Sequence, residues 1–307
     1  MNRAQRSFRV FRAVVLAAAV LIAAQPARSQ SKIEDALRQY NADAVKGYMQ
    51  PMADFFGANL GAGYYHSAAI STMGFHISIE IIGMGSLVKD ENKTYTAKAP
   101  QGFNPATFKT ATIFGDKGTE VTDQRTGLKY KGSGGIINTS IFPFAGPQIT
   151  IGSVAGTEAI IRYLPVPTKS ISKDAVPDAT LFGGGVRHSI SQYLPVAPLD
   201  LAVGVFYTRL SLGDILDLKT ISAGAQASKS FSVLTLYGGL AWEKSTMSLE
   251  YTSSDPTAPP AVSIDLDGAN SFRGTVGVQL TLAVLRLFVD ANVGSVTNFA
   301  GGIGLGF

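Results

Sequence analysis

Short segments in which apolar and polar side chains alternate recur along most of this 307-residue sequence, and no other feature constrains its fold as strongly. In residues 74–83, GFHISIEIIG, every second side chain from Phe75 onward is apolar, and polar residues stand between them. The same period appears in 198–208, 271–282 and 285–293. A period of two is that of a β-strand whose two faces meet different surroundings. Each segment is about ten residues long, the length that a tilted strand needs to cross a bilayer.

The links between the expected strands alternate in length, which favours a membrane barrel over a secreted sandwich. Strands are expected at 72–88, 146–153, 156–165, 180–193, 198–208, 216–228, 231–251, 271–282, 285–293 and 298–307. The short links are 154–155, 194–197, 229–230 and 283–284, and the long ones are 89–145, 166–179, 209–215 and 252–270. Only the link 294–297 breaks this alternation. Outer-membrane barrels have short turns at one end and long loops at the other. With further strand-like pieces at 107–114 and 126–132, we expect an all-β, transmembrane antiparallel β-barrel of 10–14 strands, with a short N-terminal helix.

Residues 1–29 have the pattern of a signal peptide. Their basic start carries no acid, residues 13–24 are apolar, and Ala27 and Ser29 form a small-residue cleavage site. The apolar run is shorter than the ~20 residues of a membrane-spanning helix. The net charge of +4 belongs to this segment, because removing its five arginines from the 26 basic residues leaves 21 against 22 acidic ones. The basic pI therefore does not indicate an acidic partner.

Residues 30–71 form a separate segment ahead of the barrel, which occupies 72–307. The stretch 31–49 has helical spacing of apolar residues, and Pro51 is expected to end the helix, since residues 53–65 are too rich in glycine to continue it. Two interpretations stay open: a plug or hatch inside the barrel, or a helix that caps its periplasmic end.

The last strand has a lipid-facing pattern that ends at the final residue. Its outward positions are Phe299, Ile303, Leu305 and Phe307. This ending resembles the sorting signal that outer-membrane barrels present to their assembly machinery. The expected partners are therefore outer-membrane lipid and the barrel assembly machinery.

Several longer motifs resemble a family of uncharacterised bacterial outer-membrane β-barrel proteins. They are TATIFGD (110–116), GTEAIIRYLPVP (156–167), LFGGGVRHSISQYLPV (181–196) and the ending GGIGLGF. The resemblance implies a barrel fold and an outer-membrane location, and it assigns no chemistry. A weaker similarity links the chain to outer-membrane transporters of hydrophobic compounds, which pair an N-terminal hatch with a barrel. It rests on FNPATF (103–108), which here follows the first strand.

Charged residues on the polar strand faces are the best candidates for function. By parity they line the lumen: His76, Glu80, Glu158, Arg162, Arg187, Asp200, Arg273 and Asp290. Inside a narrow barrel such side chains either brace the wall or set the selectivity of a pore. His188 falls on the lipid side near a turn. The run Gly183–Gly185 is expected to allow tight strand curvature.

The sequence predicts no cofactor, metal or nucleic-acid site. Its three histidines have no metal-ligand spacing, and its basic residues form no stripe with aromatic ones. We therefore expect a barrel that is not an enzyme: a passive channel or a transporter of small or hydrophobic compounds, with a small hydrophobic ligand as a further partner. One alternative is a closed structural or surface-interaction barrel that acts through 89–145 and 252–270. Another is a membrane-embedded lipid-modifying enzyme.

Overall fold

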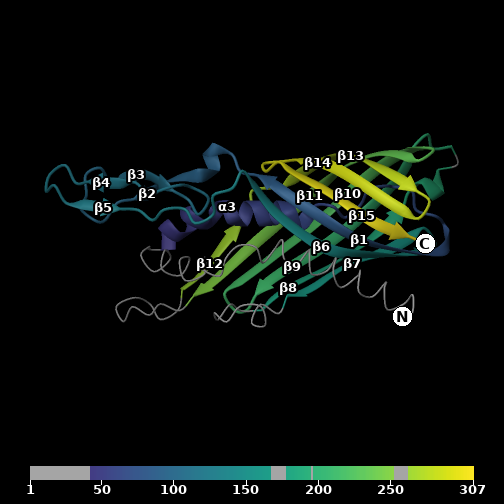
Figure 1. The fold of residues 1–307 in the computed structure, drawn as a ribbon, viewed down its shortest axis with the longest axis horizontal. Helices are drawn as coiled ribbons and strands as arrows, with labels where there is room; N and C mark the ends of the chain where they lie inside the picture. Colours follow the sequence, from purple (N-terminus) through teal and green to yellow (C-terminus); the bar gives the residue numbers. More distant parts are fainter. Residues whose placement is uncertain (1–41, 167–177, 195, 252–261) are drawn as a thin grey trace, which may run out of the picture.

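A computed structural model of the chain describes residues 42–166, 178–194, 196–251 and 262–307. The signal-peptide segment 1–29 and residues 30–41 lie outside these residues. Ten antiparallel strands form a closed barrel, as predicted (Figure 1). In ring order they are β1 (Met73–Leu87), β6 (Ile141–Val154), β7 (Thr157–Val166), β8 (Ala179–Ser189), β9 (Asp200–Leu212), β10 (Leu216–Phe231), β11 (Leu234–Tyr251), β13 (Phe272–Leu282), β14 (Leu285–Val293) and β15 (Asn298–Gly306). The ring closes where β15 pairs with β1, from Ser78↔Gly306 to Ser86↔Asn298.

The outer wall of the barrel is apolar. Alternate residues of each strand point away from the lumen, and most of these outward residues are aliphatic or aromatic. Leu240 and Val276, for example, are exposed over 74% and 66% of their surface. Larger aromatic side chains stand toward the ends of this band: Tyr163, Phe182, Trp242 and Phe272 at one end and Phe75, Tyr193, Phe231 and Phe307 at the other. An apolar band between aromatic girdles is the surface that a barrel presents to lipid.

The two ends of the barrel differ. At the short-turn end, tight turns join β6 to β7, β10 to β11 and β13 to β14, and the carboxy-terminal residue lies here. At the long-loop end, the predicted loops 209–215 and 252–270 are wrong in part. The strands β9 and β10 continue to Leu212 and from Leu216, so only a three-residue turn separates them. A further strand, β12 (Val262–Asp267), pairs with the end of β11, from Thr246 to Tyr251. β13 pairs only with the earlier part of β11, so β12 extends the wall beyond β13 at this end.

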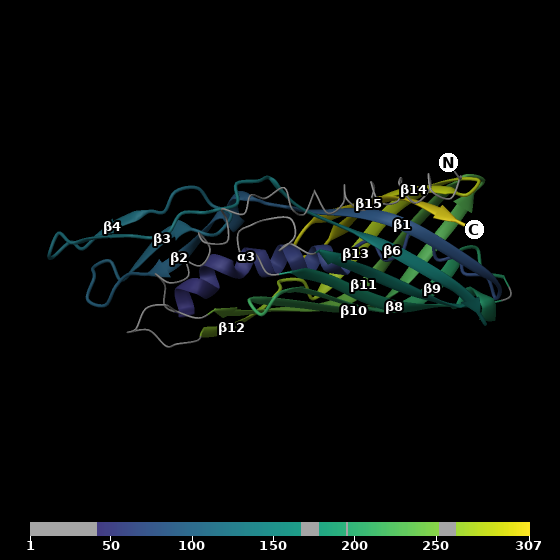
Figure 2. The same cartoon turned by 60° about the horizontal axis from the view of Figure 1, so that its bottom comes forward.

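The long link between β1 and β6, residues 88–140, forms an arm outside the barrel. The strand-like pieces at 107–114 and 126–132 do not join the barrel wall. They belong to two separate hairpins, and a 3-10 turn, η1 (Asp90–Lys93), precedes the first. The hairpins are β2 (Thr94–Lys98) with β3 (Thr107–Ala111), and β4 (Glu120–Thr122) with β5 (Lys129–Lys131). A small core of Ala97, Phe108 and Val121 joins them, and Figures 1 and 2 show the arm beyond the long-loop end.

One long helix, α3 (Ala42–Gly61), corrects the prediction for the N-terminal segment. The helix does not end at Pro51 but continues through it for ten more residues. Proline inside a helix costs about 3 kcal/mol, and burial of the surrounding apolar side chains exceeds that cost. The glycines also fit: a Cβ on Gly57 would lie 2.2 Å from the Ser245 hydroxyl of β11, so glycine lets helix and wall approach closely.

The helix lies along the lumen, in the half toward the long-loop end (Figure 2). One polar stripe of the helix, with Lys46, Gln50 and Asp54, is exposed or half-buried. The other side chains are mostly buried, as in an amphipathic helix. They pack against lumen-facing residues such as Ile82 of β1, Leu218 of β10 and Met247 of β11. No helix in the described part of the chain combines the length and apolarity needed to cross a membrane.

Candidate functional site

Two arginines from opposite walls hold the end of α3. Arg162 of β7 donates to the backbone carbonyls of Leu60 (3.4 Å) and Ala62 (2.8 Å). Arg273 of β13, five strands away in the ring of ten, donates to the carbonyl of Gly61 (2.5 Å). The last carbonyls of a helix lack partners within it and carry the negative end of its dipole. The guanidinium groups therefore supply both the missing donors and a complementary charge.

Each arginine has a further partner in the wall, and Arg162 also contacts a residue of the segment that follows the helix. The Nε of Arg162 donates to Gln148 Oε1 (2.8 Å), and the guanidinium lies over the Tyr64 ring, 3.7 Å from its centroid. The Nη1 of Arg273 lies 2.8 Å from Glu243 Oε2. Arg162 and Glu243 are only 2% and 1% exposed. Breaking the buried Arg273–Glu243 pair would leave an uncompensated charge, so these contacts hold the two guanidinium groups in position for the helix carbonyls.

After the helix, residues 62–72 run through the lumen toward the short-turn end, where β1 begins. We call residues 42–72 the plug. The Tyr64 hydroxyl is hydrogen-bonded to the Thr208 hydroxyl, and its ring stacks on Phe206 at 4.5 Å between centroids. A Cβ on Gly183 would lie 2.7 Å from the Tyr64 hydroxyl, so this glycine makes room for the plug. That contact gives the glycine a role in packing the lumen besides the strand curvature expected from the sequence.

His66 attaches the plug to three strands at once. Its Nε2 lies 2.7 Å from Glu80 Oε1, its Nδ1 is hydrogen-bonded to Gln279, and its ring stacks on Phe288 at 4.6 Å. Glu80 also accepts a hydrogen bond from Ser78 (3.1 Å). The carboxylate is thus bound by plug and wall together.

A second polar cluster lies closer to the short-turn end. Arg187 donates through Nε to Glu158 Oε1 (2.8 Å) and through Nη1 to the carbonyl of Ser67 (2.6 Å) and to Gln226 Oε1 (2.9 Å). His76 Nε2 lies 3.3 Å from the other oxygen of Glu158. The guanidinium of Arg187 thus joins the plug to the wall, as that of Arg162 does closer to the long-loop end.

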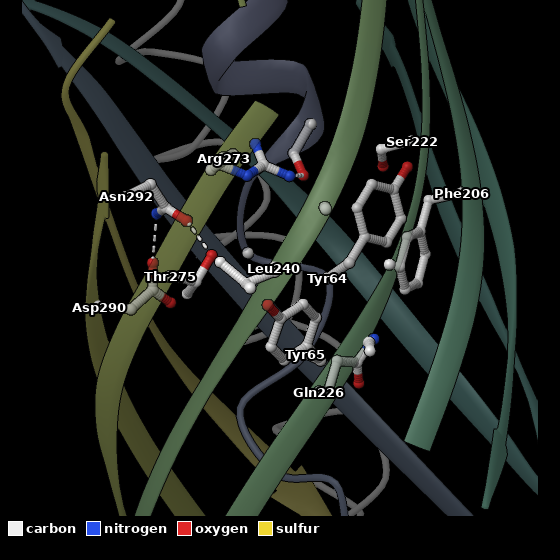
Figure 3. Close-up of a pocket in the computed structure, with 15 residues that line it drawn as sticks. Tyr64, Tyr65, Phe206, Ser222, Gln226, Leu240, Arg273, Thr275, Asp290 and Asn292 are labelled. Carbon is white, nitrogen blue, oxygen red and sulfur yellow. Dashed lines mark hydrogen bonds between the residues drawn. The ribbon is translucent and has the colours of Figure 1, made fainter. Parts of the chain in front are cut away.

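The centre of the lumen is nearly filled. A cavity of about 10 Å³ lies beside Tyr64 and Tyr65, below Arg273 (Figure 3). This space is about the least that a single water molecule needs. On one side of it, Thr275 donates to Asn292 (2.7 Å), which donates to Asp290 (2.5 Å).

A much larger cavity lies at the short-turn end, and we call it the vestibule. Its volume is about 720 Å³, and residues of the plug form part of its wall. Hydroxyl groups dominate the rest, among them Ser78, Thr150, Ser189, Ser230, Thr235 and Thr281. The apolar core around α3 separates the vestibule from the long-loop end.

The structure places all eight predicted lumen residues on the inner face of the wall. Six are buried: Glu80, Glu158, Arg162, Arg187, Arg273 and Asp290. His76 and Asp200 are half-buried and line the vestibule. The charges fall into two groups, one around the end of α3 and one around the vestibule. The four residues of the expected assembly signal are exposed on the outer wall, with Phe307 at 66%.

Sequence reasoning missed Arg286, Glu243 and the plug residue His66. Arg286 has the parity of Asp290 on the same strand, so its inward position could have been predicted. Glu243 lies within the long alternating segment 231–251, where its polar position indicates the inner face of the barrel. His66 carries no signal of its own, because its partners come from strands far away in the sequence.

His188 lies near a turn, as expected, and its partners are Thr157, Gln192 and Tyr193. Within the described residues, no group of three or more His, Asp or Glu side chains is arranged to hold a metal ion.

Comparison with protein families adds one assignment. A family model described as "Family of unknown function (DUF6588)" matches residues 7–307. The chain belongs to the DUF6588 family. No curated protein matches this DUF6588 member.

Several solved structures are similar to the DUF6588 chain at low sequence identity, and one of them is an outer membrane protein by its title. A loop-deletion mutant of OmpT, an outer membrane protein of Vibrio cholerae, is 11% identical, with a TM-score of 0.29 over 76% of this chain and 98% of that one. The translocator domain of autotransporter NalP from Neisseria meningitidis is 12% identical, with a TM-score of 0.30 over 87% and 98%. A Pseudomonas aeruginosa FadL homologue is 8% identical, with a TM-score of 0.25 over 85% and 97%.

Proposed function

We propose that this DUF6588 protein is an outer-membrane barrel that is closed by its own plug and presents the arm as an interaction module. The observation that carries this proposal is the helix α3, which fills the lumen with a packed apolar core. The apolar, aromatic-rimmed outer wall supports the membrane location. By the same rule for barrels, the short-turn end faces the periplasm and the long-loop end, with the arm, faces outward.

The packing of α3 argues against a freely open channel. Six of its large apolar side chains are at most 7% exposed: Val45, Tyr48, Met49, Met52, Phe55 and Leu60. Burial of one such side chain is worth about 1.5–3 kcal/mol. Moving all six into water therefore costs on the order of 10 kcal/mol, which corresponds to an open population of about 10⁻⁷.

The purified protein in planar bilayers is accordingly expected to show no unitary conductance steps at moderate voltage and neutral pH. Insertion is checked independently by the shift in electrophoretic mobility between heated and unheated samples. Regular steps from the unmodified protein would contradict a closed lumen and support the passive channel instead.

The arm has the composition of a binding surface for an anionic partner. Residues 88–140 carry eight basic and five acidic side chains, whereas the chain without residues 1–29 is close to neutral. Exposed lysines on the two hairpins include Lys109 and Lys131. Such a surface attracts anionic headgroups or polymers, with an affinity that falls as salt rises.

Asp123 organises the tip of the arm, and its loss is expected to loosen it. The carboxylate accepts hydrogen bonds from the Thr126 hydroxyl and from the backbone N–H of Asn104 (2.9 Å), which hold its pKa at about 2. The folded pKa is below the unfolded value of about 3.9. The stabilisation is therefore full above pH ~4 and lost as pH falls through ~2. Pepsin should cut the arm increasingly over that range.

The matched control is Asp116→Asn, which removes another carboxylate of the arm. At neutral pH, Asp123→Ala should make the arm sensitive to added protease, and Asp116→Asn should not. Equal sensitivity of the two variants would show that Asp123 does not organise the tip.

Gated transport is a second candidate, favoured by the vestibule. A cavity of about 720 Å³ beneath the plug has the size of a small-molecule site. Transport of a solute would then require movement of the plug. We propose no catalytic step: the lumen histidines His66 and His76 have carboxylate and amide partners, which supports a structural role for them.

A further inference from the structure

The vestibule holds two charged side chains that the plug does not use. We propose that it binds a short zwitterionic solute, of the size of a di- or tripeptide with free ends. In this arrangement Asp200 of β9 receives the amino group and Arg286 of β14 receives the carboxylate.

Both side chains point into the cavity. Asp200 has the parity of buried Ala202, Arg286 has the parity of buried Phe288, and both residues line the vestibule. Their strands are four places apart in the ring of ten, so the two charges stand on nearly opposite walls. A ligand with opposite charges at its two ends matches this placement of one carboxylate and one guanidinium on different walls.

Neither charge is neutralised by a direct contact within the described residues. The cavity's other carboxylate, Glu158, is already bound by Arg187 and by His76. The carboxylate of Glu80 interacts electrostatically with Arg286, but its direct partner is His66, with 2.7 Å between Glu80 Oε1 and His66 Nε2. One carboxylate and one guanidinium therefore remain for a ligand. A half-buried charge without a partner is unfavourable, and a ligand of opposite charge relieves that cost.

The wall between the two charges suits the backbone of a peptide. Strands β10, β11 and β13 contribute the hydroxyls of Ser230, Thr235 and Thr281 to it, and each hydroxyl can form further hydrogen bonds beside the one that it makes within the wall. Hydroxyl groups both donate and accept hydrogen bonds, as peptide units require. This lining favours a polar ligand over the small hydrophobic one expected from the sequence.

The test is calorimetric titration of the purified full-length protein in detergent with tri-alanine, N-acetyl-tri-alanine and tri-alanine amide. Tri-alanine should bind, and each blocked peptide should bind about tenfold more weakly, because it lacks one charge-assisted contact. The variants Asp200→Asn and Arg286→Gln provide the crossed comparison. Asp200→Asn should remove the discrimination against the acetylated peptide alone, and Arg286→Gln that against the amide alone.

Arg209→Gln is the control, because it removes a charge from the outer surface at the long-loop end. It should leave all three affinities unchanged. Three results would overturn the proposal: no heat of binding with millimolar tri-alanine, equal binding of blocked and unblocked peptides, or variants that weaken every peptide alike. The proposal requires neither plug movement nor arm binding, so its failure leaves the conductance result for the closed barrel unaffected.

Discussion

Replacing both Arg162 and Arg273 with alanine is expected to destabilise the folded barrel, so that the double variant loses its heat-modifiable form at a lower temperature. Each guanidinium is buried against the carbonyls at the end of α3. Losing a hydrogen bond to a charged group costs about 1.5–3 kcal/mol. The two together therefore cost about 3–6 kcal/mol, while the ~10 kcal/mol that we assign to apolar packing of the helix remains. The double variant should stay closed in planar bilayers, and its unfolding temperature should fall by on the order of 10 °C.

The control for this experiment is Arg209→Ala. Arg209 forms an exposed ion pair with Asp217, and exposed pairs are worth little. Its loss should leave the unfolding temperature unchanged. A double variant that unfolds at the temperature of the unmodified protein would show that the apolar core alone holds the plug and that the arginines contribute nothing.

Deleting Phe307 is expected to prevent assembly, leaving the protein unfolded in the periplasm. The backbone of Phe307 exchanges two hydrogen bonds with Ile77, at 2.8 and 3.1 Å, and thereby closes the β1–β15 seam at the short-turn end. Its ring is 66% exposed on the outer wall. The deletion removes both the seam contacts and the apolar end of the expected assembly signal. The measurement is the fraction of heat-modifiable protein in outer-membrane extracts.

Phe307→Ala separates the two contributions, since it keeps the backbone bonds and removes only the ring. If the ring is the signal, this variant should fail to assemble nearly as fully as the deletion. Normal assembly of both variants would contradict the role that we assign to the final residue.

The strands could be predicted from the sequence because lipid imposes one rule on their outer face. The inner face follows no single rule, and there the sequence contained a signal that was missed. Along β1, the inward positions change from polar Ser78 and Glu80 to apolar Ile82 and Met84. β7 shows the same change, from Arg162 to Leu164. Apolar residues inside a barrel imply something apolar to cover them, and that is α3.

The continuation of α3 past Pro51 could not be predicted from local propensity. Proline and the glycines of 53–65 disfavour a helix in water, and tertiary contacts with several distant strands, among them β1, β10 and β11, offset that preference. The pairing of His66 with Glu80, and of Arg162 with the plug, also depends on tertiary structure. Parity indicated which charges face inward, whereas their partners required the fold.

The position of the plug also constrains the order in which the barrel forms. The plug is covalently joined to β1, and the ring is closed by β15, the last strand of the chain. The strands that surround the helix come from both ends of the described sequence, so the wall around the plug is complete only when β15 pairs with β1. The contacts that hold the helix therefore span nearly the full described sequence, from Gly61 to Arg273. Such non-local contacts make folding slow. The first residues of the described chain are enclosed only after its last strand, β15, has paired with β1.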